Sequence, residues 1–254
     1  MSLIKFSHTI FAMPFALIGF MLGVFYSGEA TSVIPGWHTT IFPNWAIYGS
    51  GNGFLERIQT SMLAKLVLVI LCMVFARSAA MAFNRFLDRS FDAKNPRTAI
   101  REIPAGILKA NSVLWFTIIC SLLFVVCCWF INRLCFYLSP VALFVVLFYS
   151  YTKRFTPLCH LVLGLGLSLA PIGAFIAVTG EFHLVPILFS LTVIFWVSGF
   201  DIIYSLQDEE FDKSQQLHSI PAWLGKKKAL LVSRVLHLLS IYMEIGRASC
   251  RERV

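Results

Sequence analysis

Seven long stretches of apolar side chains constrain the fold of this chain more than any other feature of its sequence. The hydrocarbon core of a lipid bilayer is about 30 Å thick, and a helix of about 20 apolar residues crosses it. Hydrophobic residues make up 58% of the chain and charged residues only 13%, whereas roughly 25% of a soluble domain is charged. We therefore expect an all-α, polytopic transmembrane helix bundle, with helices over residues 9–26, 63–83, 113–131, 134–151, 158–179, 184–206 and 229–243.

Lysine and arginine are unevenly distributed among the loops between these stretches. They are concentrated after the second, fourth and sixth stretches, whereas residues 180–183, which read GEFH, contain none. Loops rich in Lys and Arg lie on the cytoplasmic side of membrane proteins. We therefore expect these three loops to face the cytoplasm at a bacterial-type inner membrane. The net charge of +8 then indicates orientation in a lipid bilayer, and no nucleic-acid partner is expected.

The end of the chain, EIGRASCRERV, breaks the pattern of the rest. It places three arginines where the last helix should still be crossing the membrane. With one choice of codons, this peptide back-translates to a common sequencing-library adapter. We therefore expect residues 244–254 to be an adapter artefact, and residues 1–243 to form one transmembrane domain that is incomplete at its C-terminus.

Three oxygen-bearing side chains follow the second apolar stretch: Asn84, Asp88 and Asp92. Their spacing of four residues places them on one face if the helix continues beyond the apolar stretch. Two interpretations are open at this point. One is a binding site, and the other is a solvated helix end whose carboxylates pair with the neighbouring Arg85 and Arg89.

A second acidic pair, Asp208 and Asp212, follows the sixth stretch on the same side of the membrane. Carboxylates held together require a cation, and sites made only of oxygen suit Mg²⁺, which shares carboxylates with substrate phosphates. Arg97, Arg101 and Lys153 lie in the same group of loops, and Arg and Lys bind phosphate oxygens. Orientation in the membrane explains any one of these cations equally well. Together the residues predict a Mg²⁺-dependent diphosphate site beside an apolar bundle, which suits polyprenyl diphosphate.

These residues resemble the motifs of the UbiA superfamily of intramembrane aromatic prenyltransferases. Three motifs are matched in the order found in that superfamily: Asn84, Asp88 and Asp92, then Tyr149 and Lys153, then Tyr204, Asp208 and Asp212. The similarity extends from KFSHTIFAMPFALIG near the start of the chain to HSIPAWLGKKKA. It therefore covers nearly the whole chain.

The resemblance implies a membrane fold of nine helices around a central cavity, of which seven are visible here. Residues 28–61 depart from it as an unusually long outer loop. The resemblance also implies a Mg²⁺ site formed by the two aspartate motifs: Asn84, Asp88, Asp92, Asp208 and Asp212. The four aspartates of this set would also be the catalytic residues. The diphosphate would be held by cations and oriented by tyrosines, namely Arg97, Arg101, Lys153, Tyr149 and Tyr204.

The implied reaction is an electrophilic aromatic substitution. Mg²⁺ and the cations stabilise the departing diphosphate, an electron-rich ring attacks the allylic cation, and the ring then loses a proton. The contexts ARSAAMAFNR and LHSIPA look like the branch that prenylates 4-hydroxybenzoate. One alternative acceptor is a carboxylated naphthalene, which would be used for menaquinone synthesis. Haem and chlorophyll are further alternatives.

Two charged side chains, Arg77 and Asp201, lie within the apolar stretches. A charge inside the membrane is costly, which makes each of them a candidate functional residue. We expect Arg77 to face the interior and to bind an acceptor carboxylate or the diphosphate. A structural pair with another buried polar group is the alternative for both residues. His160 lies near the cytoplasmic side, and we expect it to be interfacial.

A divalent-cation transporter is the competing class of function, because it also needs acidic side chains in a membrane. A transporter predicts polar residues along the whole path through the bilayer. Here the acidic side chains cluster at one end of the helices, and a transporter would leave the phosphate-binding cations without a ligand. The sequence therefore favours the enzyme.

Overall fold

The computed structural model describes residues 6–29 and 61–252, with side chains described for residues 12–27 and 61–244. The long outer loop expected at residues 28–61 lies outside the described residues, apart from its two ends. Every element in the described part of the chain is helical, which confirms the all-α class. The elements are α1 (Phe6–Glu29), α3 (Met62–Asp92), α4 (Ala110–Ile131), α5 (Arg133–Thr152), α6 (Cys159–Thr179), α7 (Leu184–Ser205), η1 (Leu206–Asp208), α8 (Glu209–Ser214) and α9 (Ile220–Glu252).

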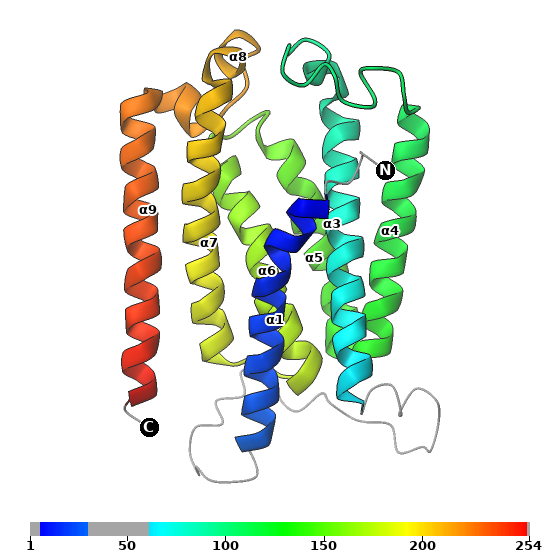
Figure 1. The fold of residues 1–254 in the computed structure, drawn as a ribbon, viewed down its shortest axis with the longest axis vertical. Helices are drawn as coiled ribbons and strands as arrows, with labels where there is room; N and C mark the ends of the chain where they lie inside the picture. The colour runs from blue at the N-terminus through cyan, green and yellow to red at the C-terminus, as the bar shows by residue number, and fades with distance from the viewer. Residues whose placement is uncertain (1–5, 30–60, 253–254) are drawn as a thin grey trace.

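Each of the seven apolar stretches corresponds to one long helix, and these helices run side by side along the long axis of the molecule (Figure 1). Five described helical segments are long and apolar enough to cross a membrane: Met62–Asp92, Ala110–Ile131, Arg133–Thr152, Cys159–Thr179 and Leu184–Ser214. A shorter apolar segment, Ala12–Ser27, lies within α1. The membrane-spanning bundle expected from the sequence is therefore confirmed.

Helix α3 ends later than its apolar stretch. It continues to Asp92, whereas the apolar residues stop at Phe83. Residues 84–92, NRFLDRSFD, are mostly polar and include no Gly or Pro, so the helix leaves the apolar region without breaking. The extension keeps Asn84, Asp88 and Asp92 on one helix, as their spacing predicts.

Small residues let neighbouring helices approach closely. A Cβ on Gly19 of α1 would lie 2.2 Å from the backbone oxygen of Pro171 in α6. A Cβ on Gly164 of α6 would lie 2.4 Å from Ser198 Oγ in α7. Such contacts are typical of membrane helices, which associate through small side chains. They place α6 in the middle of the bundle, between α1 and α7.

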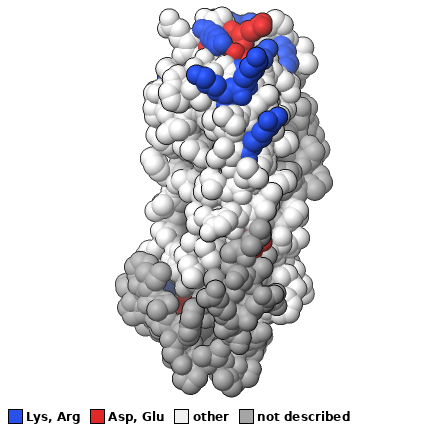
Figure 2. Space-filling model, turned by 90° about the vertical axis from the view of Figure 1, so that its left-hand side faces the viewer, with Lys and Arg blue, Asp and Glu red and all other residues white. Residues whose placement is uncertain are grey.

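The polar segments gather at one end of the bundle. The segment between α3 and α4 and helix α8 both lie at the upper end in Figure 1. In the side view of Figure 2, most of the visible Lys, Arg, Asp and Glu side chains cluster at this same end. We call it the polar end. It holds both aspartate motifs, which the sequence predicted to face one side of the membrane.

Candidate active site at the polar end

The first aspartate motif lies on the last turns of α3. Asn84 Nδ2 donates a hydrogen bond to Asp88 Oδ2 at 3.1 Å, which confirms that the two side chains share a face. Asp88 Oδ1 lies 3.7 Å from Arg154 Nη2, just beyond the end of α5. The same Arg154 nitrogen donates to the backbone oxygen of Leu87 at 2.8 Å. Arg154 therefore ties the loop after α5 to the acidic face of α3.

The last aspartate of this motif is paired within the segment that follows α3. Arg101 Nη1 donates to both oxygens of Asp92, at 2.9 and 2.8 Å, and Asp92 is only 7% exposed. Thr98 Oγ1 donates to the backbone oxygen of Asp92 at 3.2 Å. Arg85 and Glu102 form a further ion pair between α3 and this segment. These contacts fold residues 93–109 back over the end of α3.

Arg97 and Asp208 connect the two motif regions. Arg97 Nε donates to Asp208 Oδ1 at 3.1 Å, and its Nη2 donates to Oδ2 at 2.5 Å. Asn95 Nδ2 also lies 3.5 Å from Asp208 Oδ1. Burial lowers the pKa of Arg97, but the hydrogen bond and the charge of Asp208 outweigh burial and raise this pKa above its usual value. The Arg97 guanidinium lies 6.0 Å from the ring of Tyr204, at the outer limit of a cation–π contact.

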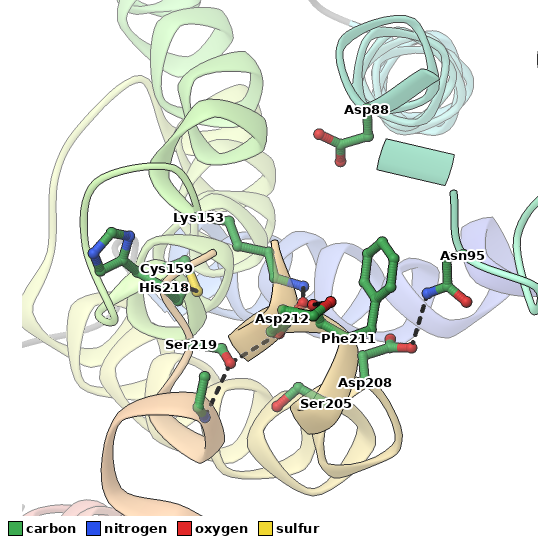
Figure 3. A network of polar contacts seen from close by, with 12 residues as sticks. Asp88, Asn95, Lys153, Cys159, Ser205, Asp208, Phe211, Asp212, His218 and Ser219 are labelled. Carbon is green, nitrogen blue, oxygen red and sulfur yellow. Dashed lines mark hydrogen bonds and ion pairs between the residues drawn. The ribbon is translucent and has the colours of Figure 1, made fainter. Parts of the chain in front are cut away.

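Asp212 is the most deeply buried acid of the site, with no exposed surface. Its Oδ1 lies 2.7 Å from Lys153 Nζ at the end of α5, and its Oδ2 accepts a 2.9 Å hydrogen bond from Ser219 Oγ. Ser219 Oγ in turn accepts the backbone N–H of Ala222 at 3.3 Å. Figure 3 shows Asp212 held between Lys153 and Ser219, with Asp208 turned toward Asn95. The two aspartates of the second motif therefore point to different partners.

An apolar cavity lies within the bundle. Its empty volume, which includes space open to solvent, is about 1100 Å³. Arg77 and Tyr149 are the two residues of the predicted site that line it, among small and aliphatic side chains from α3, α5 and α6. Tyr149 lies one helical turn before Lys153, and Arg77 lies two turns before Asn84. The polar part of the cavity wall is therefore close to the charged groups.

Arg77 has a donor that no described side chain uses. Its Nε is buried without a hydrogen-bond partner among the described residues. It also interacts electrostatically with Tyr149. A buried donor without a partner costs roughly 1–3 kcal/mol, so a ligand acceptor at this position would bind favourably. The expectation that Arg77 faces the interior is thus consistent with its place on the cavity wall.

The donor set of the two motifs fits Mg²⁺ in its chemistry, because it consists of carboxylate and amide oxygens. Among the described residues, however, no three His, Cys, Asp or Glu side chains come close enough together to hold a metal ion. Each of the four aspartates is instead paired with a Lys or an Arg: Arg154, Arg101, Arg97 and Lys153. The geometry shown is therefore a set of ion pairs, and the metal ligands remain a prediction.

The sequence did not indicate Asn95 and Ser219 as site residues. Asn95 is 8% exposed, and its Oδ1 accepts the backbone N–H of Arg97 at 3.0 Å. An Asn followed by Pro is a turn signal, so this local bond could have been anticipated from the sequence. The reach of Arg154 to Asp88, and that of Ser219 to Asp212, depends on helix packing and carries no local signal.

The sequence is similar to proteins of a known family. The model of the UbiA prenyltransferase family matches residues 45–246. A 4-hydroxybenzoate octaprenyltransferase from Francisella tularensis subsp. novicida is 31% identical over 176 residues, which cover 68% of this chain and 62% of that protein. One from Tolumonas auensis is 32% identical over 183 residues, covering 71% of this chain and 64% of that protein. The matches thus span less than two thirds of the length of these curated relatives.

Solved structures share the fold. A UbiA homologue from Aeropyrum pernix K1 has a TM-score of 0.77 and 29% identity, with 97% of this chain and 80% of that chain covered. A UbiA homologue from Archaeoglobus fulgidus, bound to DMAPP and Mg²⁺, has a TM-score of 0.61 and 19% identity, with 91% and 74% covered. Because the family model spans most of the sequence and the helices superpose on this fold, the chain belongs to the UbiA prenyltransferase family.

Proposed function

We propose that this chain transfers a polyprenyl group from polyprenyl diphosphate to an aromatic acid, in a Mg²⁺-dependent reaction that releases diphosphate. The observation that carries the proposal is the gathering of four paired aspartates at the polar end of a bundle that encloses an apolar cavity lined by Arg77 and Tyr149. A substrate with a charged head and a long apolar tail fits such a site. The favoured acceptor is 4-hydroxybenzoate, in quinone biosynthesis.

The ion pairs explain how the polar end would receive a metal and a diphosphate together. Each aspartate of the two motifs has a cationic partner, so the charges of the site are compensated before the substrate binds. With both bound, the carboxylates would serve the metal, and the cations would bind the phosphate oxygens. Opposite charges stay paired throughout, which limits the cost of desolvating them.

The proposed roles follow from these positions. Asn84, with the four aspartates Asp88, Asp92, Asp208 and Asp212, would hold Mg²⁺, which when bound stabilises the charge of the leaving diphosphate. The oxygens of that diphosphate would be bound by cations and oriented by nearby tyrosines: Arg97, Arg101, Lys153, Tyr149 and Tyr204. The cations donate to oxygens whose charge grows as the bond to the prenyl group breaks, so they favour the transition state.

The cavity would hold the reacting ends of both organic substrates. Its aliphatic lining suits an isoprenoid chain. The Nε of Arg77 is available to the carboxylate of an aromatic acid, and a guanidinium binds carboxylates in a fixed geometry. Fixing the carboxylate of the acceptor would orient its ring toward the polar end, where the allylic carbon would lose its diphosphate. Orientation of this kind contributes much of the rate in two-substrate reactions.

The names of the relatives support this proposal. The relatives from Francisella and Tolumonas carry the name 4-hydroxybenzoate octaprenyltransferase. The Archaeoglobus homologue with the same fold was solved with DMAPP and Mg²⁺. We further propose that the polar end faces the cytoplasm at a bacterial-type inner membrane, because Lys and Arg gather there (Figure 2).

The test supplies membranes containing the full-length protein with a polyprenyl diphosphate and Mg²⁺, and with either 4-hydroxybenzoate or a carboxynaphthalene. Mass spectrometry identifies the products. Prenylated 4-hydroxybenzoate that forms only with Mg²⁺ is the expected result. Prenylation of the carboxynaphthalene alone would move the protein to menaquinone synthesis. No product with either acid from folded protein would contradict the proposal, and divalent-cation transport would be assayed next.

A further inference from the structure

His160 and Asp201 form a buried pair that the proposed function does not yet use. His160 Nδ1, on the first turn of α6, lies 2.7 Å from Asp201 Oδ2 on α7. The His160 side chain is 3% exposed, so it is buried and not interfacial as expected from the sequence. The Asp201 side chain is 29% exposed. One oxygen of this carboxylate is therefore held by the imidazole while part of the group stays open.

The hydrogen bonds assign the protons of this pair. The backbone N–H of Ile220, at the start of α9, donates to His160 Nε2 at 3.3 Å. A backbone N–H can only donate, so Nε2 carries no proton, and the single imidazole proton lies on Nδ1. His160 then donates to Asp201 as a neutral ring. The carboxylate keeps its full negative charge.

This charge sets Asp201 apart from the motif aspartates. Those four are each paired with a Lys or an Arg. Among the described residues, the ion-pair partner shown for Asp201 is His160. The open part of the Asp201 carboxylate is therefore not occupied by a Lys or Arg among the described residues. Asp201 is thus suited to accept a proton.

Helix packing brings the pair within electrostatic range of Tyr149 on the cavity wall. Gly164 allows α6 to approach α7, and Ser198 Oγ donates to the backbone oxygen of His160 at 3.1 Å, which fixes the first turn of α6 against α7. Tyr149, which lines the cavity, interacts electrostatically with Asp201. The carboxylate therefore lies within electrostatic range of the cavity wall, near the end where the diphosphate would leave.

We propose that Asp201 is the base that removes the ring proton of the aromatic acceptor, and that His160 is a positioning residue that holds its carboxylate. The inference rests on the proposed function. The C–O bond of the prenyl diphosphate breaks with its electron pair on the diphosphate, and the ring forms a C–C bond to the allylic carbon. The proton on that ring carbon passes to the free oxygen of Asp201, and its bonding electrons restore the aromatic ring.

The test uses Asp201→Asn in the full-length protein and measures turnover with 4-hydroxybenzoate, either unlabelled or deuterated at both ring positions next to its hydroxyl. Loss of a general base lowers turnover by about 100-fold or more. Proton removal then limits the rate, so the deuterated acceptor reacts more slowly in the variant than the unlabelled one does. The KM for the prenyl diphosphate stays at its parent value, because Asp201 does not bind the diphosphate.

Two His160 variants test the pair independently of Asp201→Asn, which matters if that variant does not fold. In His160→Asn, an amide N–H replaces Nδ1–H near Asp201, and most of the turnover is retained. In His160→Phe the donor is lost, turnover falls, and the isotope effect appears. Equal loss in both variants without an isotope effect would show a structural role only and overturn the inference.

The outcomes separate the two proposals. If the parent protein prenylates the acid and Asp201→Asn does so at the parent rate, the inference is wrong while the proposed function stands. A loss of turnover in Asp201→Asn that comes with a raised KM for the prenyl diphosphate and no isotope effect would also overturn the inference, because it indicates a ligand-binding role. Absence of product from the parent protein itself would overturn both.

Discussion

Arg97 and Asp208 join two loops that lie 111 residues apart in the sequence, through two parallel hydrogen bonds of 3.1 and 2.5 Å. One loop follows the first aspartate motif, and the other carries the second motif. The pair therefore brings the two motifs to one end of the bundle. A fork-shaped guanidinium is suited to this task, because it binds both carboxylate oxygens at once.

Replacing Arg97 by Lys tests the geometry of this pair. The charge stays, but a lysine ammonium cannot reproduce the two parallel bonds. We expect the KM for the prenyl diphosphate to rise by roughly 10-fold, in line with the loss of one charge-assisted hydrogen bond. Steady-state kinetics at saturating acceptor measures the change. An Arg97→Lys variant with parent kinetics would show that only the charge matters there.

Replacing Arg77 by Leu tests the proposed contact with the acceptor. The KM for 4-hydroxybenzoate should rise by roughly 10-fold or more, because a charged hydrogen-bond donor to its carboxylate is removed. The KM for the prenyl diphosphate should not change. Competition with the methyl ester of 4-hydroxybenzoate provides the control, since the ester lacks the charge that Arg77 would bind and should lose no affinity in the variant. An equal effect on both substrates would contradict the assignment.

The pair of Lys153 and Asp212 should contribute to stability as well as to activity. Lys153→Met leaves a carboxylate with no exposed surface and without its cation. The expected loss in unfolding free energy is roughly 1–3 kcal/mol, less than for a fully buried pair, because 35% of the Lys153 side chain is exposed. Thermal unfolding in detergent measures it.

The double variant Lys153→Met, Asp212→Asn is the matched control for this prediction. It removes the uncompensated charge and should recover most of the lost stability. Turnover should be abolished in both the single and the double variant, because Lys153 and Asp212 belong to the proposed site. If the double variant is as unstable as Lys153→Met alone, the loss of stability does not come from an unpaired carboxylate.

The close approach of α1 and α6 predicts a site where a single methyl group is harmful. In Gly19→Ala, the new Cβ would lie 2.2 Å from the backbone oxygen of Pro171, so the helices must separate. Overpacking of this kind costs about 1–3 kcal/mol. Gly173→Ala, on the same α6, is the control, because nothing lies within 4 Å of its added Cβ. A lower melting temperature for Gly19→Ala alone is expected, and similar values for both variants would show that the contact can relax.

The sequence was sufficient to predict where the helices lie and which polar residues share one face of a helix. Apolar stretches locate helices because each must satisfy its own backbone hydrogen bonds in lipid. The four-residue spacing of Asn84, Asp88 and Asp92 places them on one face of a helix, and the hydrogen bond from Asn84 to Asp88 confirms this for the first two. Such predictions depend only on residues near one another in the chain.

Partners that are distant in the sequence could not be predicted in the same way. Asp208 and Asp212 share the spacing of a single face, yet Asp208 lies at the end of the short η1 and Asp212 in α8. They pair with Arg97 and Lys153, respectively, on different elements. The packing of the helices decides which cation pairs with which carboxylate. It also decides the burial of His160, whose Nε2 accepts a hydrogen bond from the backbone N–H of Ile220.

We propose that the paired aspartates at the polar end carry out Mg²⁺-dependent prenyl transfer. The most direct measurement compares product formation by the parent protein with that of Asp88→Asn, Asp208→Asn and the control Glu210→Gln, each in membranes with Mg²⁺, a polyprenyl diphosphate and 4-hydroxybenzoate. Glu210 is an exposed acid at the same end of the molecule. We predict that both aspartate variants insert into the membrane but form no product, while Glu210→Gln matches the parent. Undiminished product formation in both aspartate variants would contradict the account.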